Sequence, residues 1–231
     1  MPSGPRWHPV ADALALEDEA VARISDAARQ ALALQDFFRI VLAGGNTPRN
    51  VYRKLVGLRT DWSRWQVYFG DERCLPVNDE QRNDRMASAT LLDQAPIPAG
   101  AVHRIPAERG AADAARAYER TLADVGVFDL VLLGLGEDGH TASLFPGHER
   151  GDAPGSPDVL AVFDAPKPPP ERVSMSAARL SRARGVLFLV AGESKCDAVR
   201  RWFVGEDIPA ASVQAPGGVN VLVEEALLPS T

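Results

Sequence analysis

The chain has 231 residues, of which 45% are hydrophobic and 24% charged, a composition typical of a soluble globular protein. Its net charge of -6 argues against a nucleic-acid surface, which needs clustered Lys and Arg. No apolar run is long enough for a membrane span, and residues 1–10 contain no signal-peptide core, so we expect a cytoplasmic protein. Neither Cys74 nor Cys196 belongs to a CxxC pair, so we expect two reduced thiols.

Predicted helices and strands alternate along the chain. Apolar spacing and capping signals predict helices over 14–34, 48–58, 83–92, 111–125 and 194–204, with Thr47 as N-cap and Pro48 at the first position of the second. Short apolar runs predict strands over 38–42, 65–69, 128–133, 185–190 and 219–223. The alternation predicts a single α/β domain over residues 1–231, a three-layer α/β/α sandwich with a mostly parallel, Rossmann-like sheet.

The most informative stretch is 129–148, where a buried apolar strand runs into a glycine-rich turn. This turn presents Asp138 and His140 at the carboxyl end of the strand, where ligands bind in such sheets. Histidine is suited to proton transfer near neutral pH, so we expect a functional rather than a purely structural role for His140. We expect no such role for the remaining histidines, His8, His103 and His148.

The same turn contains the spacing Gly134-x-Gly136-x-x-Gly139, which resembles a dinucleotide-binding fingerprint. That fingerprint requires the third glycine to open a long helix, but Pro146 and Gly147 would stop a helix within about two turns. We therefore expect no nicotinamide cofactor.

Three further groups of polar residues follow predicted strands. Gly44, Gly45, Asn46 and Thr47 precede a helix, and such a loop suits an anion such as a phosphate ester; a tight turn with a Thr cap is the alternative. Asp71 and Arg73 follow the second strand, where Arg73 suits an oxyanion and Asp71 a histidine or a water. Arg172 and Lys195 are together candidate cations for the anion site, although each alone is more typical of surface charge.

Several common catalytic motifs are missing from the sequence. It contains no GxSxG nucleophile elbow, no GxxxxGK[ST] phosphate loop and no HExxH zinc pair. Covalent serine chemistry, ATP hydrolysis and common zinc hydrolysis therefore have no support.

Together these segments resemble the 6-phosphogluconolactonase family. The resemblance runs from about Phe37 to Val223 and rests on four segments in order: 44–48 (GGNTP), 70–73 (GDER), 138–147 (DGHTASLFPG) and 169–176 (PPERVSMS). The third segment is very specific, whereas the first is shared with related sugar-phosphate isomerases. Asn46 stands where many relatives have serine.

The resemblance implies hydrolysis of 6-phospho-D-glucono-1,5-lactone to 6-phosphogluconate without metal or cofactor, by a monomer. It implies that His140 is the general base and that Asp71 or Asp138 holds its tautomer. It further implies that Arg73 faces the lactone carbonyl or its oxyanion. The residues implied to hold the phosphate are Gly44, Gly45, Asn46, Thr47, Arg172 and Lys195.

Two other functions compete with lactone hydrolysis. An isomerase or deaminase of amino-sugar phosphates would resemble relatives that have a carboxylate five residues after the histidine, where this chain has Phe145, and a tyrosine in place of Arg73. A non-catalytic sugar-phosphate sensor would usually carry a further module. The sequence leaves open which acid partners His140, the ring-size preference, and the roles of Cys74 and Ser143.

Overall fold

Seven parallel strands form the central sheet of the structure, a computed structural model that describes residues 4–229. Residues 1–3 and 230–231 lie outside the described residues. The first three belong to the N-terminal stretch 1–10, and all five belong to the predicted domain 1–231. In spatial order the strands are β1 (Arg6–Val10), β10 (Val219–Glu224), β9 (Val186–Val190), β6 (Leu130–Gly134), β2 (Phe38–Leu42), β3 (Trp65–Phe69) and β5 (Val102–His103). The strands β6 and β9 are almost wholly apolar and buried, as expected for a parallel sheet covered on both faces.

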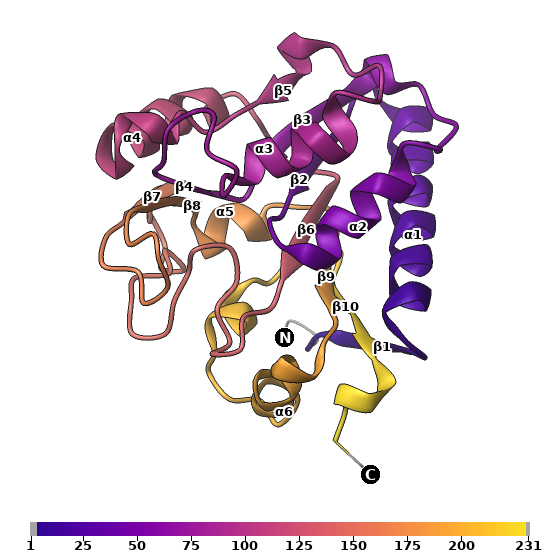
Figure 1. The fold of residues 1–231 in the computed structure, drawn as a ribbon, viewed down its shortest axis with the longest axis vertical. Helices are drawn as coiled ribbons and strands as arrows, with labels where there is room; N and C mark the ends of the chain where they lie inside the picture. The colour runs from indigo at the N-terminus through magenta and orange to yellow at the C-terminus, as the bar shows by residue number, and fades with distance from the viewer. Residues whose placement is uncertain (1–3, 230–231) are drawn as a thin grey trace.

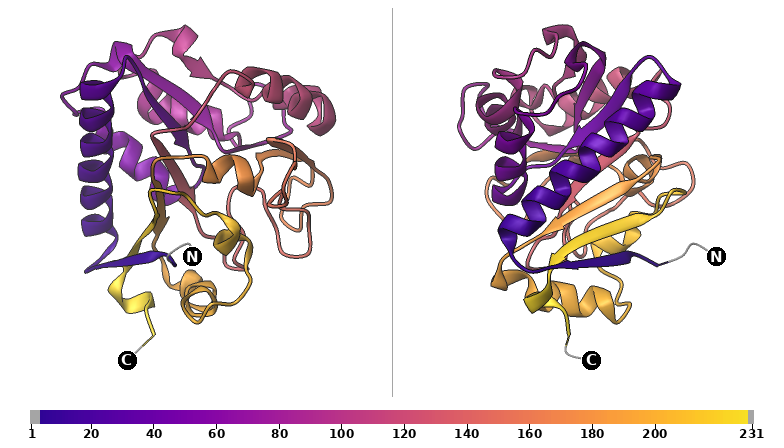
Figure 2. Two further views of the ribbon diagram at one scale, coloured as in Figure 1. Left: turned by 180° about the vertical axis from the view of Figure 1, so that it is seen from behind. Right: turned by 90° about the vertical axis from the view of Figure 1, so that its right-hand side faces the viewer.

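Helices cover both faces of this sheet (Figure 1). They are α1 (Ala13–Leu34), α2 (Asn46–Leu55), α3 (Asn83–Ala87), α4 (Ala111–Leu122), α5 (Ala177–Ser181) and α6 (Cys196–Phe203). Figure 1 places α1 and α2 on one side and α4, α5 and α6 on the other, and the views in Figure 2 agree. The predicted three-layer sandwich is therefore confirmed. None of the helices within residues 4–229 has the length and apolarity to cross a bilayer.

The longest helix, α1, shows how the sequence specifies its position. Asp12 caps the helix, since its carboxylate accepts a hydrogen bond from the backbone N–H of Ala15 at 2.8 Å. The buried face, which follows a helical repeat, consists of Leu16, Glu17, Ala20, Ile24, Ala28 and Ala31. Burial of this face places α1 along the sheet, where it also packs against α2.

The predicted start of α2 is wrong. The helix begins at Asn46 rather than Pro48, its N-cap is Gly45, and no side chain caps it, so Thr47 is not the N-cap. Gly45 has φ 110°, a conformation that glycine adopts without strain, and this turn lets the helix begin earlier. Pro48 then lies in the first turn, where a missing N–H breaks no intrahelical bond.

Other segments differ from the predicted elements. The predicted helix over 83–92 is α3 followed by a π-helical turn, Ser88–Leu92. The sequence did not predict β1, an edge strand whose Pro9 lacks a donor. It also missed a small antiparallel sheet made of β4 (Asp71–Arg73), β8 (Arg172–Met175) and β7 (Val159–Val162), in that order. This small sheet supplies three predicted site residues, Asp71, Arg73 and Arg172.

The strand order brings the predicted loops together. After β2 the chain continues through α2 to β3 on one side, whereas after β6 it continues to β9 on the other. The neighbouring strands β2 and β6 therefore flank a topological switch point, where open α/β sheets form a crevice at the carboxyl ends of their strands. The loop after β2 begins with Ala43 and Gly44, and the loop after β6 contains Asp138 and His140.

Candidate active site

A cavity of about 200 Å³ lies at the carboxyl ends of β2, β3 and β6. Seven of the ten predicted site residues line it: Gly44, Gly45, Asp71, Arg73, His140, Arg172 and Lys195. The three others lie beside it: Asp138 touches His140, and Asn46 and Thr47 form the first turn of α2. The fold thus gathers residues that are up to about 150 positions apart in the sequence.

His140 is held by Asp138 in a short and well-defined contact. Asp138 Oδ1 lies 2.5 Å from His140 Nδ1 and also accepts the backbone N–H of His140 at 3.1 Å. The His140 side chain is 18% exposed and lines the cavity, whereas Asp138 is 33% exposed. With Asp138 ionised, Nδ1 carries the proton and Nε2 keeps a free lone pair, the tautomer that a general base needs.

The pKa values of this pair fit that assignment. Burial lowers the pKa of His140, although the Asp138 carboxylate opposes the shift, so the imidazole is neutral near pH 7. Burial alone would raise the pKa of Asp138, but the hydrogen bond and charge of His140 outweigh it and lower that pKa. The pair is therefore a neutral base beside an ionised carboxylate.

Gly136 makes room for the imidazole. A Cβ atom added to Gly136 would lie 2.0 Å from His140 Nδ1, so any other residue would displace the ring. The turn is closed by hydrogen bonds from Gly136 N to His140 O at 2.7 Å and from Gly139 N to Gly136 O at 3.0 Å. No helix follows Gly139 in this described stretch, and Thr141 bridges to Leu144 instead. The glycines therefore shape the turn that holds His140, and no long helix opens at Gly139, as predicted from Pro146 and Gly147.

Asp71 is buried and makes no hydrogen bond to His140 among the described residues. Its Oδ2 accepts the hydroxyl of Ser143 at 2.6 Å, and its Oδ1 accepts Asn83 Nδ2 at 3.0 Å. Of the two acids that the sequence left open, Asp138 is the one that contacts His140. Ser143, whose role the sequence left unassigned, ties the histidine loop to β4.

Asn83 is a site residue that the sequence did not reveal. It lines the cavity from the start of α3, and its Oδ1 lies only 2.0 Å from where a Cβ on Gly44 would stand. Gly44 is thus required for Asn83 to reach Asp71. Asn83 follows a long loop after β4, so no sequence spacing marks it as part of the site.

Glu72, the neighbour of Asp71, has a different position. It is buried and accepts the backbone N–H groups of Arg73, Asn83 and Asp84, each at 2.8 Å. Burial raises the pKa of Glu72. Its carboxylate therefore fixes the start of α3 rather than facing the cavity.

Arg73 and Arg172 provide two adjacent cations. They are cross-strand partners in the register of β4 and β8, and both line the cavity. Arg73 donates to the carbonyl of Gln81, while its Nε is buried without a hydrogen-bond partner among the described residues. Arg172 is 5% exposed and lies over the Phe145 ring, 5.4 Å from its centroid.

The loop after β2 presents backbone donors. Gly44 and Gly45 line the cavity, and the first turn of α2 has no side-chain cap, so the N–H groups of Asn46 and Thr47 have no intrahelical acceptor. The Asn46 side chain is exposed and Thr47 is half-buried, and neither lines the cavity. Lys195, in the turn before α6, lines it from the β9 side, and burial lowers its pKa.

The other histidines and Cys74 have structural surroundings. His8 Nε2 lies 2.9 Å from Asn220 Oδ1, and His103 Nε2 lies 2.7 Å from Gln66 Oε1. His148 packs its edge against Phe145. Burial raises the pKa of Cys74 to about 11, so its thiol is protonated at neutral pH.

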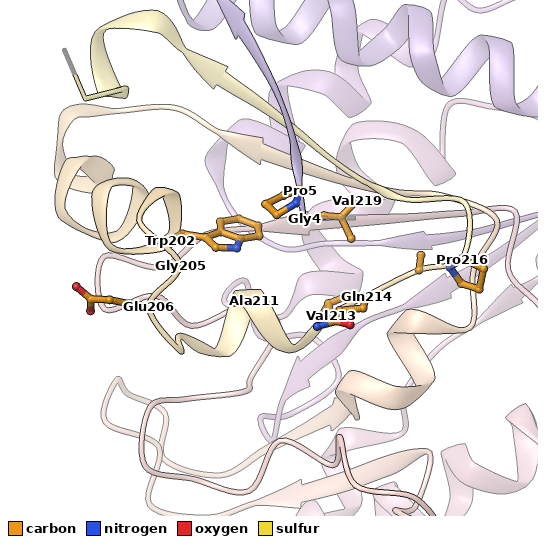
Figure 3. A pocket seen from close by; sticks show the side chains of 11 residues that line it. Gly4, Pro5, Trp202, Gly205, Glu206, Ala211, Val213, Gln214, Pro216 and Val219 are labelled. Atoms are coloured by element: carbon orange, nitrogen blue, oxygen red, sulfur yellow. The ribbon is translucent and has the colours of Figure 1, made fainter. Parts of the chain in front are cut away.

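A larger cavity of about 520 Å³ lies elsewhere, between the start of β1 and the end of α6 (Figure 3). Most of its lining is apolar, and Glu206 is its charged lining residue in the described chain. Glu206 pairs with Arg201 at 2.9 Å, and Arg201 Nη1 donates to the carbonyl of Asp138 at 3.4 Å. Its described lining contains no proton-transfer pair, so the smaller cavity is the candidate active site.

The chain is similar to known proteins over most of its length. Residues 11–222 match the family described as glucosamine-6-phosphate isomerases/6-phosphogluconolactonase. The chain belongs to this family. A 6-phosphogluconolactonase of Mycobacterium leprae is 36% identical over 224 residues, covering 91% of this chain and 90% of the relative. One of Synechocystis is 36% identical over 225 residues, covering 91% of each chain.

Solved structures show the same fold. The crystal structure of 6-phosphogluconolactonase from Thermotoga maritima superposes with a TM-score of 0.88 at 29% identity, covering 96% of this chain and 100% of that one. The enzyme from Trypanosoma brucei gives a TM-score of 0.86 at 27% identity, covering 98% of each chain. The resemblance drawn from the sequence is therefore confirmed.

Proposed function

We propose that this protein hydrolyses 6-phospho-D-glucono-1,5-lactone to 6-phospho-D-gluconate, the second step of the oxidative pentose phosphate pathway. The observation that carries the proposal is the contact of His140 with Asp138 in a cavity that is also lined by two arginines and a lysine. Relatives that align with nearly the whole chain are 6-phosphogluconolactonases, which supports the choice of substrate.

The base in the proposed reaction is His140 Nε2. It removes a proton from water while the water oxygen attacks the lactone carbonyl carbon, giving a tetrahedral oxyanion. Collapse of this intermediate breaks the bond between that carbon and the ring oxygen, and the imidazolium of His140 returns its proton to the leaving oxygen. The product is a carboxylic acid, which ionises near neutral pH and releases one proton.

We assign the two arginines to different negative charges of the bound substrate, Arg73 to the oxyanion and Arg172 to the phosphate. We assign Arg73 to the lactone carbonyl because its buried Nε has no hydrogen-bond partner among the described residues and requires an acceptor. Asp71, anchored by Ser143 and Asn83, is assigned to a supporting role at the reacting end rather than to the histidine tautomer.

We assign the phosphate to the anion-binding side of the cavity. The donors there are the backbone of Gly44 and Gly45, the free N–H groups of Asn46 and Thr47, and the cations Arg172 and Lys195. A phosphate bound at this end would orient the lactone against His140, so its binding energy would lower the barrier at the reacting end.

The proposed reaction consumes only the lactone and water, and it assigns no step to a metal or a cofactor. A lactone is an activated ester, so one base and one cationic contact to the oxyanion are the groups that its hydrolysis requires. We further propose that the protein acts in the cytoplasm as a single-domain monomer, without nucleic acid or membrane as partner.

A specific contact argues against the isomerase alternative. Phe145, five residues after His140, is fully buried and packs on the imidazole with ring centroids 4.7 Å apart. No carboxylate therefore occupies this position to open a sugar ring. The sensor alternative requires no base, so the contact between His140 and Asp138 in the cavity favours an enzyme.

The test is proton release after addition of freshly generated 6-phosphogluconolactone, with a chelator in a parallel sample. We expect acid release well above the spontaneous rate and unaffected by the chelator. Release at only the spontaneous rate, or formation of fructose 6-phosphate and ammonia from glucosamine 6-phosphate, would reject the lactonase function. Loss of activity with chelator would reject only its metal-free form.

A further inference from the structure

Lysine is rare in this chain, and its distribution is uneven. The sequence contains three lysines: Lys54, Lys167 and Lys195. Lys54 lies on α2 and pairs with Asp18 at 2.6 Å and Glu17 at 3.0 Å, away from the cavity. Lys195 lines the cavity. Lys167 belongs to the proline-rich segment, residues 165–170.

Arg172 fixes the backbone of this segment. Its Nε donates to the carbonyl of Pro169 at 3.1 Å, and its Nη2 donates to the carbonyls of Lys167 at 2.9 Å and Pro168 at 3.2 Å. A further bond from Ala165 N to Pro170 O, at 3.0 Å, closes the segment. Three hydrogen bonds of Arg172 therefore hold the segment, and its Nη1 has no hydrogen-bond partner among the described residues.

The Lys167 side chain extends toward the histidine loop. Its Nζ lies 3.9 Å from Oε2 of Glu137, the residue that precedes Asp138 in the sequence. The Lys167 side chain is 43% exposed. A long and exposed ion pair contributes little free energy, so the ammonium can exchange this carboxylate for a better anion. Lys167 also acts on the site through its charge. Burial is the main cause that lowers the pKa of His140 and the pKa of Lys195, and the positive charge of Lys167 lowers both further.

We propose that Lys167 is a further binding residue for the substrate phosphate, placed at the rim of the cavity beside Lys195 by Arg172. This inference rests on the proposed function, since it names a phosphorylated sugar lactone as the ligand. Two lysines whose charges repel each other are stabilised by a shared anion, and a phosphate dianion is the part of this substrate that fits. Arg172 then acts both as a direct donor, through Nη1, and as the residue that positions Lys167.

The experiment compares Lys167→Gln with Lys54→Gln, which removes the same charge far from the cavity. Calorimetry measures the binding of 6-phosphogluconate and of gluconate, which differ only in the phosphate. We expect Lys167→Gln to weaken 6-phosphogluconate binding about tenfold and gluconate binding less than twofold, with Lys54→Gln like the wild type. Equal weakening for both ligands, or an unchanged affinity for 6-phosphogluconate, would overturn the proposal.

A second measurement does not depend on the variant. Acetylation with a limiting reagent, followed by mass spectrometry, reports the reactivity of each lysine in the wild-type protein. We expect 6-phosphogluconate, but not gluconate, to protect Lys167 and Lys195 and to leave Lys54 unchanged. Protection of Lys195 alone would overturn the role of Lys167. Because both measurements use binding rather than turnover, a failure of the lactonase assay is separate from a failure of this inference.

Discussion

Arg73 and Arg172 stand opposite each other in the register of the small antiparallel sheet, both facing the same cavity. Like charges in directly opposed positions destabilise a pair of strands. Backbone carbonyls satisfy much of Arg172, but Arg73 Nε stays buried without a partner among the residues described. Two positive charges therefore lie close together at the cavity, and bound anions such as an oxyanion and a phosphate would stabilise them.

Replacement of Arg73 should lower the activity of the protein and raise its stability. We expect Arg73→Gln to lower kcat by about 100-fold or more, through loss of oxyanion stabilisation. The same change should raise the free energy of unfolding by up to about 1 kcal/mol, because it relieves the like-charge pair. Urea unfolding and steady-state kinetics check both effects, with the exposed Arg85→Gln as control. A variant with wild-type kcat would remove Arg73 from the reacting end.

The Asp138 carboxylate should set the pH dependence of the reaction. It opposes the lowering of the His140 pKa by burial, so Asp138→Asn should lower that pKa further. A general base acts in its neutral form, which exists above its pKa, so the acid limb of the pH–rate profile should move to lower pH. The plateau rate should fall by about 100-fold, because the base is weaker and its tautomer is no longer fixed. An acid limb at unchanged or higher pH would contradict this arrangement.

Gly136 should be intolerant of even one methyl group. In Gly136→Ala the new Cβ would stand 2.0 Å from His140 Nδ1, so the imidazole must leave its position beside Asp138. We expect a loss of kcat of about 100-fold, similar in size to loss of the base itself. The control is Gly126→Ala, where nothing lies within 4 Å of the added atom. Equal activity of the two variants would show that the ring position is not critical.

Ser143 should contribute to the stability of the folded protein. Ser143→Ala deprives the buried Asp71 carboxylate of a hydrogen bond at 2.6 Å. The expected cost is about 1–3 kcal/mol in the free energy of unfolding, measured by urea denaturation. The exposed Ser194→Ala should cost less than about 0.5 kcal/mol. If both variants unfold alike, Ser143 does not carry the link between the two loops.

Much of the architecture followed from local patterns in the sequence. The strands at β2, β3, β6, β9 and β10 are apolar runs between turn signals, and their alternation with helices predicted the parallel sheet. The helix boundaries were less predictable, because the backbone of Gly45, and not the side chain of Thr47, determines where α2 begins. The small antiparallel sheet could not be predicted, since short strands such as β4 owe their pairing to segments about 100 residues away.

The candidate site was predictable where chemistry follows a strand directly. His140, Asp138 and Arg73 lie within a few residues of a strand end, so the parallel-sheet rule identified them. Asn83, at the start of α3, and Lys167, in a loop, are positioned by tertiary contacts with Glu72 and Arg172 respectively. The choice of Asp138 over Asp71 as partner of His140 likewise depends on packing rather than spacing. The roles of all these residues, and the single-domain organisation, stay predictions.

The central claim, that His140 is the base, is tested most directly by His140→Ala and His140→Gln. The measurement compares kcat for 6-phosphogluconolactone with the affinity for 6-phosphogluconate in each variant. We expect kcat to fall by about 100-fold or more, while the affinity changes less than about threefold, because the base acts at the reacting end rather than on the phosphate. A large loss of affinity with kcat intact would contradict the assignment and make His140 a binding residue.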